Sequence, residues 1–135
     1  MSQENVETLR TAYVAFSRGD LDRFLDYLDP NVEVDPGLMA PDQSASRYVG
    51  RQEVRKFFET IVVGPWEAVI TESLKMIEID DSRVLSIDRW RFQGRDGIEI
   101  EMELPNLFSF RDGLILRIRG FTDRAEALEA VGLKG

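Results

Sequence analysis

The 135-residue sequence contains no cysteine and no histidine, and these two absences exclude more chemistry than any motif does. Without cysteine there is no disulfide, no thiolate nucleophile, no iron–sulfur cluster and no thiolate zinc site. Without histidine there is no Ser-His-Asp triad, no iron site built on two histidines and no imidazole base. Any catalysis must therefore use Asp, Glu, Tyr, Lys, Arg or amide groups. No carboxylates stand at a metal-ligand spacing either, so we predict no metal and no cofactor.

Positive charge is also scarce, because 17 basic residues face 25 acidic ones and the net charge is −8. Nucleic acids and anionic lipids are bound through clustered Lys and Arg, so we expect neither partner. No apolar run approaches the roughly 18 residues needed to cross a bilayer. Residues 1–10 are polar, so no signal peptide is visible, and a cytoplasmic location is the expectation.

The chain has no internal repeat, linker or low-complexity segment, so we predict one domain over residues 1–135. A chain of this length can bury roughly two-thirds of its unfolded surface. Its hydrophobic residues amount to 43%, which is ordinary for a globular protein.

Apolar residues recur at three- and four-residue spacing in three segments, which predicts three amphipathic helices. The first covers 3–17, the second follows a turn at Gly19 with Asp20 as its cap and stops at Pro30, and the third covers 50–62. The apolar faces of the first two are Val6, Leu9, Tyr13 and Phe16, and then Leu21, Phe24, Leu25 and Leu28.

Alternating apolar residues predict strands in most of the remaining chain. A short strand around Val32 and Val34 ends at Asp35-Pro36, and residues 36–49 form a loop that we expect to act as a lid or binding loop. Four further strands are predicted at 67–79, 83–93, 98–110 and 114–122, before a closing helix with Asp123 and Glu126 as a capping box. Helices first and a meander after them indicate an α+β fold.

Strand alternation also sorts side chains into an inner and an outer face. In 98–110 the predicted inner face is Ile98, Ile100, Met102, Leu104, Asn106, Phe108 and Phe110, with Asn106 its only polar member. Pairing across the 94–97 turn would set Arg91 near Glu99 and Arg89 near Glu101. That register turns Val84, Ser86, Asp88, Trp90 and Phe92 inward, so Asp88 shares the interior with Asn106.

Several segments together resemble the nuclear transport factor 2-like superfamily, and its SnoaL-like and ketosteroid isomerase branches in particular. They are residues 13–22 with 28–35, the Phe-Arg-Asp-Gly hairpin at 110–113 and the tail 119–128. The resemblance implies a cone-shaped, curved sheet of mixed or antiparallel strands packed against three N-terminal helices, with a short C-terminal helix. It also implies a pocket for a small molecule and a homodimer, which we expect to form through the outer sheet face.

The resemblance also implies roles for three residues. In the ketosteroid isomerase branch, an aspartate before a proline at the end of the first strand is the general base, and a helix tyrosine and a protonated carboxylic acid form the oxyanion hole. Asp35-Pro36 matches the base. Tyr13 resembles the tyrosine, although its distance to Gly19 is one residue shorter and a strict alignment selects Ala12. Asn106 stands where the acid would be.

The candidate catalytic residues are thus Asp35, Asp88 and Asn106. The candidate substrate-binding residues are Tyr13, Phe16, Tyr48, Trp66, Trp90, Phe108 and Arg119. Structural alternatives stay open: Asp35 as a turn residue, Asn106 as the partner of a buried backbone group or water, and Asp88 as half of an interior ion pair. Tyr13 and Phe16 also fit a packing role, and Tyr48 and Trp66 ordinary hydrophobic cover.

Three functions follow from this reading. The first is a SnoaL-like pocket protein for a small, fairly apolar organic molecule, acting without a cofactor as an isomerase, cyclase or hydrolase. Asp35 would abstract a proton, Tyr13 or Asn106 would bind the oxyanion, and Asp88 would be a second proton-transfer group. The alternatives are a non-catalytic binding module and a dimeric association domain. A cavity of ~300 Å³ or more favours a ligand over an association domain.

Overall fold

The structure, a computed structural model, describes residues 2–37 and 47–133 and has one curved, six-stranded sheet. The helices are α1 (Ser2–Ser17), α2 (Leu21–Leu25), α3 (Arg51–Phe57), the π-helix η2 (Phe58–Val63) and α4 (Arg124–Ala130). The strands are β1 (Leu28–Asp35), β2 (Tyr48–Val49), β3 (Ala68–Asp80), β4 (Arg83–Gln93), β5 (Glu99–Arg111) and β6 (Leu114–Gly120). The sheet order is β2-β1-β6-β5-β4-β3, and only β1 and β6 among these neighbours run parallel.

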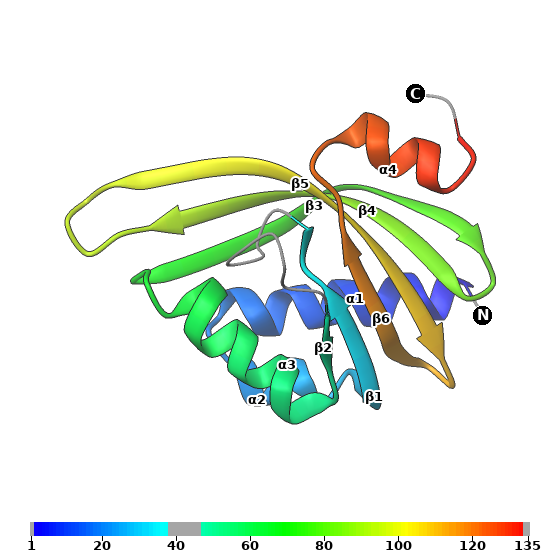
Figure 1. The fold of residues 1–135 in the computed structure, drawn as a ribbon, viewed down its shortest axis with the longest axis horizontal. Coiled ribbons are helices and arrows are strands. Elements are labelled where there is room, and N and C mark those ends of the chain that lie inside the picture. Colours follow the sequence, from blue (N-terminus) through cyan, green and yellow to red (C-terminus); the bar gives the residue numbers. More distant parts are fainter. Residues whose placement is uncertain (1, 38–46, 134–135) are drawn as a thin grey trace.

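Helices α1 to α3 lie on the inner side of the sheet and α4 lies on its other side (Figure 1). The apolar face of α1 is buried in the main core, with Leu9 and Ala12 fully covered. This arrangement confirms the α+β fold with a curved mixed sheet, three N-terminal helices and a short C-terminal helix. No helix in the described ranges is long and apolar enough to span a membrane.

The predicted second helix is shorter than expected, and Pro30 does not end it. Helix α2 begins at the Asp20 cap, whose carboxylate accepts a hydrogen bond from the Arg23 amide at 3.1 Å, and it ends at Leu25. Leu28 instead pairs with Ile115 of β6. Pro30 lies in β1 at the irregularity between Leu28 and Glu33, where a residue without an N–H is tolerated because the ladder is interrupted.

The predicted loop 36–49 is wrong in its last two residues. Tyr48 and Val49 form β2, an edge strand that pairs with Val34 and Glu33 of β1. Residues 38–46 of that loop, and with them the predicted lid, lie outside the described residues. The predicted third helix is present as α3 followed directly by η2.

The register of β4 and β5 differs from the predicted one by two residues. Arg89 pairs with Glu103 and Arg91 with Glu101, because the strands close at Gln93 and Glu99 around a longer turn than the predicted 94–97. A shift of two keeps the same side chains on each face. Val84, Ser86, Asp88 and Phe92 therefore point inward and are buried, as predicted.

The predicted inner face of β5 is buried only from Leu104 onward. Ile98, Ile100 and Met102 are 56%, 43% and 36% exposed. They lie on the part of the β4–β5 hairpin that extends past the helices (Figure 1), and β6 pairs with β5 only from Asn106 to Arg111. The outer face is likewise not all solvated, because α4 covers a second apolar cluster of Leu85, Ile87, Leu107, Phe121 and Ala127.

Candidate functional site

An apolar cavity lies between the inner face of the sheet and helices α1 to α3. The rings of Phe16, Phe24, Phe57, Phe58 and Phe108 form much of its wall, with Val34, Pro36, Val62 and Ile118 beside them. The space is about 550 Å³ when its opening to solvent is included, and the centre of a water-sized sphere can move through about 60 Å³ of it. The smaller volume is the one that compares with known cavities; it is below the ~300 Å³ of a typical ligand pocket and leaves room for several waters.

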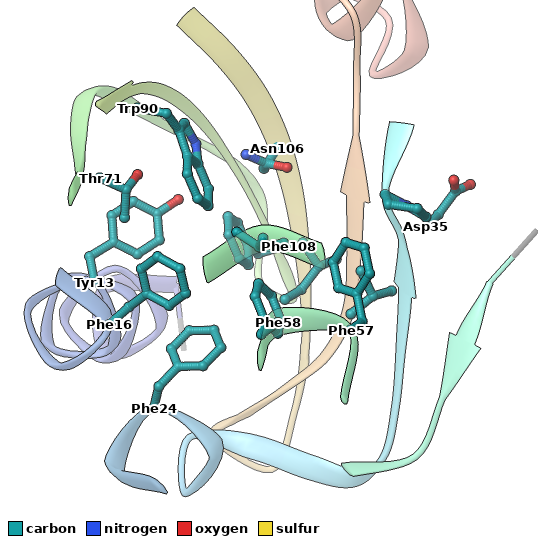
Figure 2. Close-up of a pocket in the computed structure, with 14 residues that line it drawn as sticks. Tyr13, Phe16, Phe24, Asp35, Phe57, Phe58, Thr71, Trp90, Asn106 and Phe108 are labelled. Carbon is teal, nitrogen blue, oxygen red and sulfur yellow. The ribbon is translucent and has the colours of Figure 1, made fainter. Parts of the chain in front are cut away.

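Apart from the Asp35 carboxylate, the polar side-chain atoms of the cavity gather at one end, away from Phe24 and Phe58 (Figure 2). They belong to Tyr13 of α1, Thr71 of β3, Trp90 of β4 and Asn106 of β5. Thr71 and Trp90 stand directly opposite each other across the β3–β4 ladder. Strand alternation thus delivers three of these side chains to the same place from three adjacent strands.

Asp88 lies one layer behind this polar end and is fully buried. One carboxylate oxygen accepts hydrogen bonds from the Tyr13 hydroxyl at 2.6 Å and from the Asn106 amide at 3.0 Å. The other accepts one from the Ser86 hydroxyl at 2.5 Å. All these partners are neutral, so the ion pair with an interior arginine, the structural alternative for Asp88, is not what the structure shows.

Burial without a cation raises the pKa of Asp88 to about 7, although the hydrogen bonds from Ser86, Tyr13 and Asn106 act to lower it. Burial, with the adjoining Asp88 charge as a second cause, raises the pKa of Tyr13 well above its ordinary value. Near neutral pH the Tyr13 phenol is therefore protonated, while Asp88 exists in both its charged and its neutral form.

Asp35 lies at the carboxyl end of β1, half-buried, and lines the cavity near its edge. Its carboxylate points away from Tyr13 and Trp90 (Figure 2). The backbone here is closely packed, since a Cβ on Gly120 would lie 2.9 Å from the Pro36 carbonyl oxygen. The structure therefore brings Asp35 and Asn106 to one cavity, with Asp88 behind the wall rather than in it.

The predicted substrate-binding residues divide into two groups. Tyr13, Phe16, Trp90 and Phe108 line the cavity. The other three do not: Tyr48 packs on Phe57 with ring centroids 4.6 Å apart, and Trp66 packs on Phe92 at 5.3 Å. Arg119 is exposed, with its guanidinium 4.8 Å from the centre of the Phe121 ring on the α4 side of the sheet.

Sequence reasoning missed Thr71, which is 6% exposed and has a hydroxyl without a hydrogen-bond partner in the described structure. The indole N–H of Trp90 is likewise buried and without a partner. The alternation Val69, Thr71, Ser73 within the predicted 67–79 strand was the signal that would have found Thr71. It puts these three side chains on the face opposite Ile70 and Glu72.

The fold is shared by several solved structures. A nuclear transport factor 2-like protein of unknown function from Burkholderia pseudomallei K96243 is 24% identical, with a TM-score of 0.75 over 96% of this chain and 98% of that one. The Δ5-3-ketosteroid isomerase of a Mycobacterium species is 17% identical, with a TM-score of 0.74 over 89% and 93%. Rv0760c of Mycobacterium tuberculosis, in complex with estradiol-17β-hemisuccinate, is 15% identical, with a TM-score of 0.73 over 92% and 96%.

At the level of sequence, no curated protein matches the chain. The family model of the SnoaL-like domain, however, matches residues 9–118. That range runs from Leu9 in α1 to Ile118 in β6, and so includes every element that lines the cavity among the described residues. The chain belongs to the SnoaL-like family.

Proposed function

We propose that this protein binds a small, mainly apolar organic molecule in the cavity between the sheet and α1 to α3. The observation that carries the proposal is the cavity itself, with aromatic walls and a few polar atoms at one end, as in typical ligand sites. The neighbours of the same fold support it, since one is a ketosteroid isomerase and another holds an estradiol derivative.

A cavity-filling substitution tests this binding. Val62 is 1% exposed and lines the cavity, so Val62→Phe should occupy part of the space. We expect calorimetric titration with 1-indanone, a neutral bicyclic ketone, to give at least tenfold weaker affinity than for the wild type. Val14→Phe, at a position that is 50% exposed on α1, is the matched control and should bind normally. Equal binding by both variants would place the ketone elsewhere and contradict the proposal.

A second candidate function is proton transfer on the bound molecule. Asp35 favours it, because it is the one carboxylate among the described residues that line the cavity. Asp35 would take a proton from a carbon next to a carbonyl, the step that isomerases and cyclases of this kind need. A hydrolase of this fold could activate a water with two Asp side chains linked by an Arg. The described lining contains no arginine, so nothing there supports that mechanism.

Hydrogen exchange on 1-indanone in D₂O tests this candidate. We expect the protein to accelerate exchange of the C2 hydrogens above the buffer rate, followed by NMR of the ketone. Asp35→Asn should lower that rate about 10²–10⁴-fold, the usual contribution of a general base. Binding without any accelerated exchange would leave a non-catalytic binding protein, and full exchange by Asp35→Asn would mean that Asp35 is not the base.

The homodimer expected from the family resemblance also stays a proposal, as does a cytoplasmic location. The dimer would form through the outer sheet face. Cell fractionation would test the location.

A further inference from the structure

The two groups nominated from the sequence as oxyanion donors already have their hydrogens engaged. The single hydroxyl hydrogen of Tyr13 goes to Asp88. The Asn106 amide nitrogen donates to Asp88 at 3.0 Å and to the Leu104 carbonyl oxygen at 3.4 Å. With Asp88 ionised, neither side chain has a hydrogen left for a molecule in the cavity.

Two other donors at the same end of the cavity have no partner. The Thr71 hydroxyl and the Trp90 indole N–H are buried and unpaired in the described structure, and both residues line the cavity. Buried polar groups are paired in most proteins, so two orphans that face each other across one ladder position require an explanation. In Figure 2 the Thr71 oxygen and the Trp90 nitrogen both lie at the polar end, close to the Tyr13 hydroxyl.

The chemistry of these donors defines the group that would pair with them. An indole N–H can only donate, and a threonine hydroxyl can donate as well as accept, so the shared partner is an acceptor. No Lys or Arg is among the described lining residues, and Asp35 and Asp88 stand nearby. An anionic acceptor would therefore be repelled, whereas a carbonyl, ether or hydroxyl oxygen would not.

We infer that Thr71 and Trp90 form the subsite for an uncharged acceptor oxygen, and that the ligand is a neutral, mainly apolar molecule carrying that oxygen at one end. The inference rests on the proposed binding function and deepens it. The oxygen accepts from the indole N–H and the threonine hydroxyl, while the apolar body of the ligand lies against Phe108 and Phe16. Ordered water, which could serve the same two donors, is the competing occupant.

A double-mutant cycle between ligand and protein separates these occupants. The ligands are 1-indanone and indane, which share a skeleton and differ in one carbonyl oxygen. The variants are the wild type and Thr71→Val, which keeps the side-chain shape and removes the hydroxyl. We expect Thr71→Val to weaken the binding of 1-indanone about tenfold relative to that of indane, because one hydrogen bond to the ketone oxygen is lost. Thr11→Val, on the exposed side of α1, should leave the ratio unchanged.

The indole signals give a readout that a merely structural threonine would not move. Trp66 and Trp90 are the only tryptophans, so a nitrogen–proton correlation spectrum has two indole peaks, and Trp66→Phe assigns them. We expect 1-indanone to move the Trp90 peak downfield and indane to leave it near its free position.

The possible results distinguish the inference from the function beneath it. A ratio that Thr71→Val leaves unchanged, or an equal response of Trp90 to both compounds, overturns the oxygen subsite while the binding pocket stands. Failure of both compounds to bind near Trp90 overturns the subsite and the proposed function together. Since the Thr71 hydroxyl has no protein partner, Thr71→Val should melt no lower than the wild type, so a loss of fold does not obscure the outcome.

Discussion

Asp88 shows how the inner face of this sheet couples structure to protonation. Its carboxyl is fully buried and receives only neutral donors, from Tyr13, Ser86 and Asn106. Three such hydrogen bonds reduce the penalty of burying a charge but do not remove it, and its pKa of about 7 reflects the remainder. The unfolded chain holds the same carboxyl at a pKa near 4.

This difference predicts that stability falls as the pH rises from about 4 to about 7. In that interval the folded protein keeps a proton on Asp88 that the unfolded chain has lost, so raising the pH favours unfolding. Below about 4 the carboxyl is protonated in both states, and above about 7 it is ionised in both. The difference of about three pKa units corresponds to a few kcal/mol in the free energy of unfolding. Urea titrations across this range measure it.

Asp88→Asn should remove this part of the pH dependence. An asparagine oxygen can accept from Tyr13 and Asn106, and its amide can donate to Ser86, whose hydroxyl can turn to Ser73 at 2.8 Å. The free energy of unfolding of the variant should therefore rise relative to that of the wild type as the pH increases, and the difference should level off above pH 7. Parallel curves for the two proteins between pH 4 and 8 would mean that Asp88 does not carry the raised pKa.

At the same scale, the sequence predicts buried residues better than it predicts their partners. Alternation placed Asp88, Trp90 and Asn106 inside, because a buried strand face repeats every second residue. It could not show that Tyr13, 75 positions away, would bind Asp88, since that contact depends on how α1 packs on the sheet. Arg119 was nominated without a known face, and it lies over Phe121.

At the scale of elements, helices and strands with strong periodicity are where the sequence predicts them, and the exceptions have local causes. The β4–β5 register moved by two residues because the turn length, which alternation does not specify, sets the pairing. Exposure of Ile98 and Ile100 depends on where neighbouring elements stop, not on the strand itself. β2 is too short for any periodicity to reveal it, and it forms because the β1 edge offers pairing groups.

Contacts between elements also decide where Asp35 can act. A Cβ on Gly37, whose φ is +58°, would lie 2.7 Å from the Gly120 carbonyl oxygen. The segment after β1 can therefore approach the end of β6 this closely only because residue 37 is a glycine. Gly120 pairs with Asn106 on its other side. This packing holds Asp35 beside the same strand end that carries Asn106, which the sequence spacing alone does not show.

At the scale of the whole molecule, we predict a homodimer in which the outer sheet face is the contact. Part of that face is charged, with Arg89 within 3.2 Å of Glu72 and 3.3 Å of Glu101, and part is covered by α4. Ile70, opposite Arg91 on the outer face, is a partly exposed apolar residue there. Ile70→Lys should therefore shift sedimentation at micromolar concentration from dimer towards monomer.

The matched control for the dimer is Ile100→Lys, on the inner face of the projecting hairpin. It should leave the dimer intact. Wild-type protein that sediments as a monomer would contradict the dimer altogether. Dissociation by Ile100→Lys but not by Ile70→Lys would place the contact on the opposite face.

We propose that a small molecule binds in the cavity and not on the exposed apolar hairpin. Nuclear Overhauser effects between bound 1-indanone and the protein measure this most directly, because they identify the side chains next to the ligand. We predict contacts to Phe108, Val62 and Ile118, which line the cavity. Contacts confined to Ile98, Ile100 and Met102, the exposed residues of the hairpin, would contradict it.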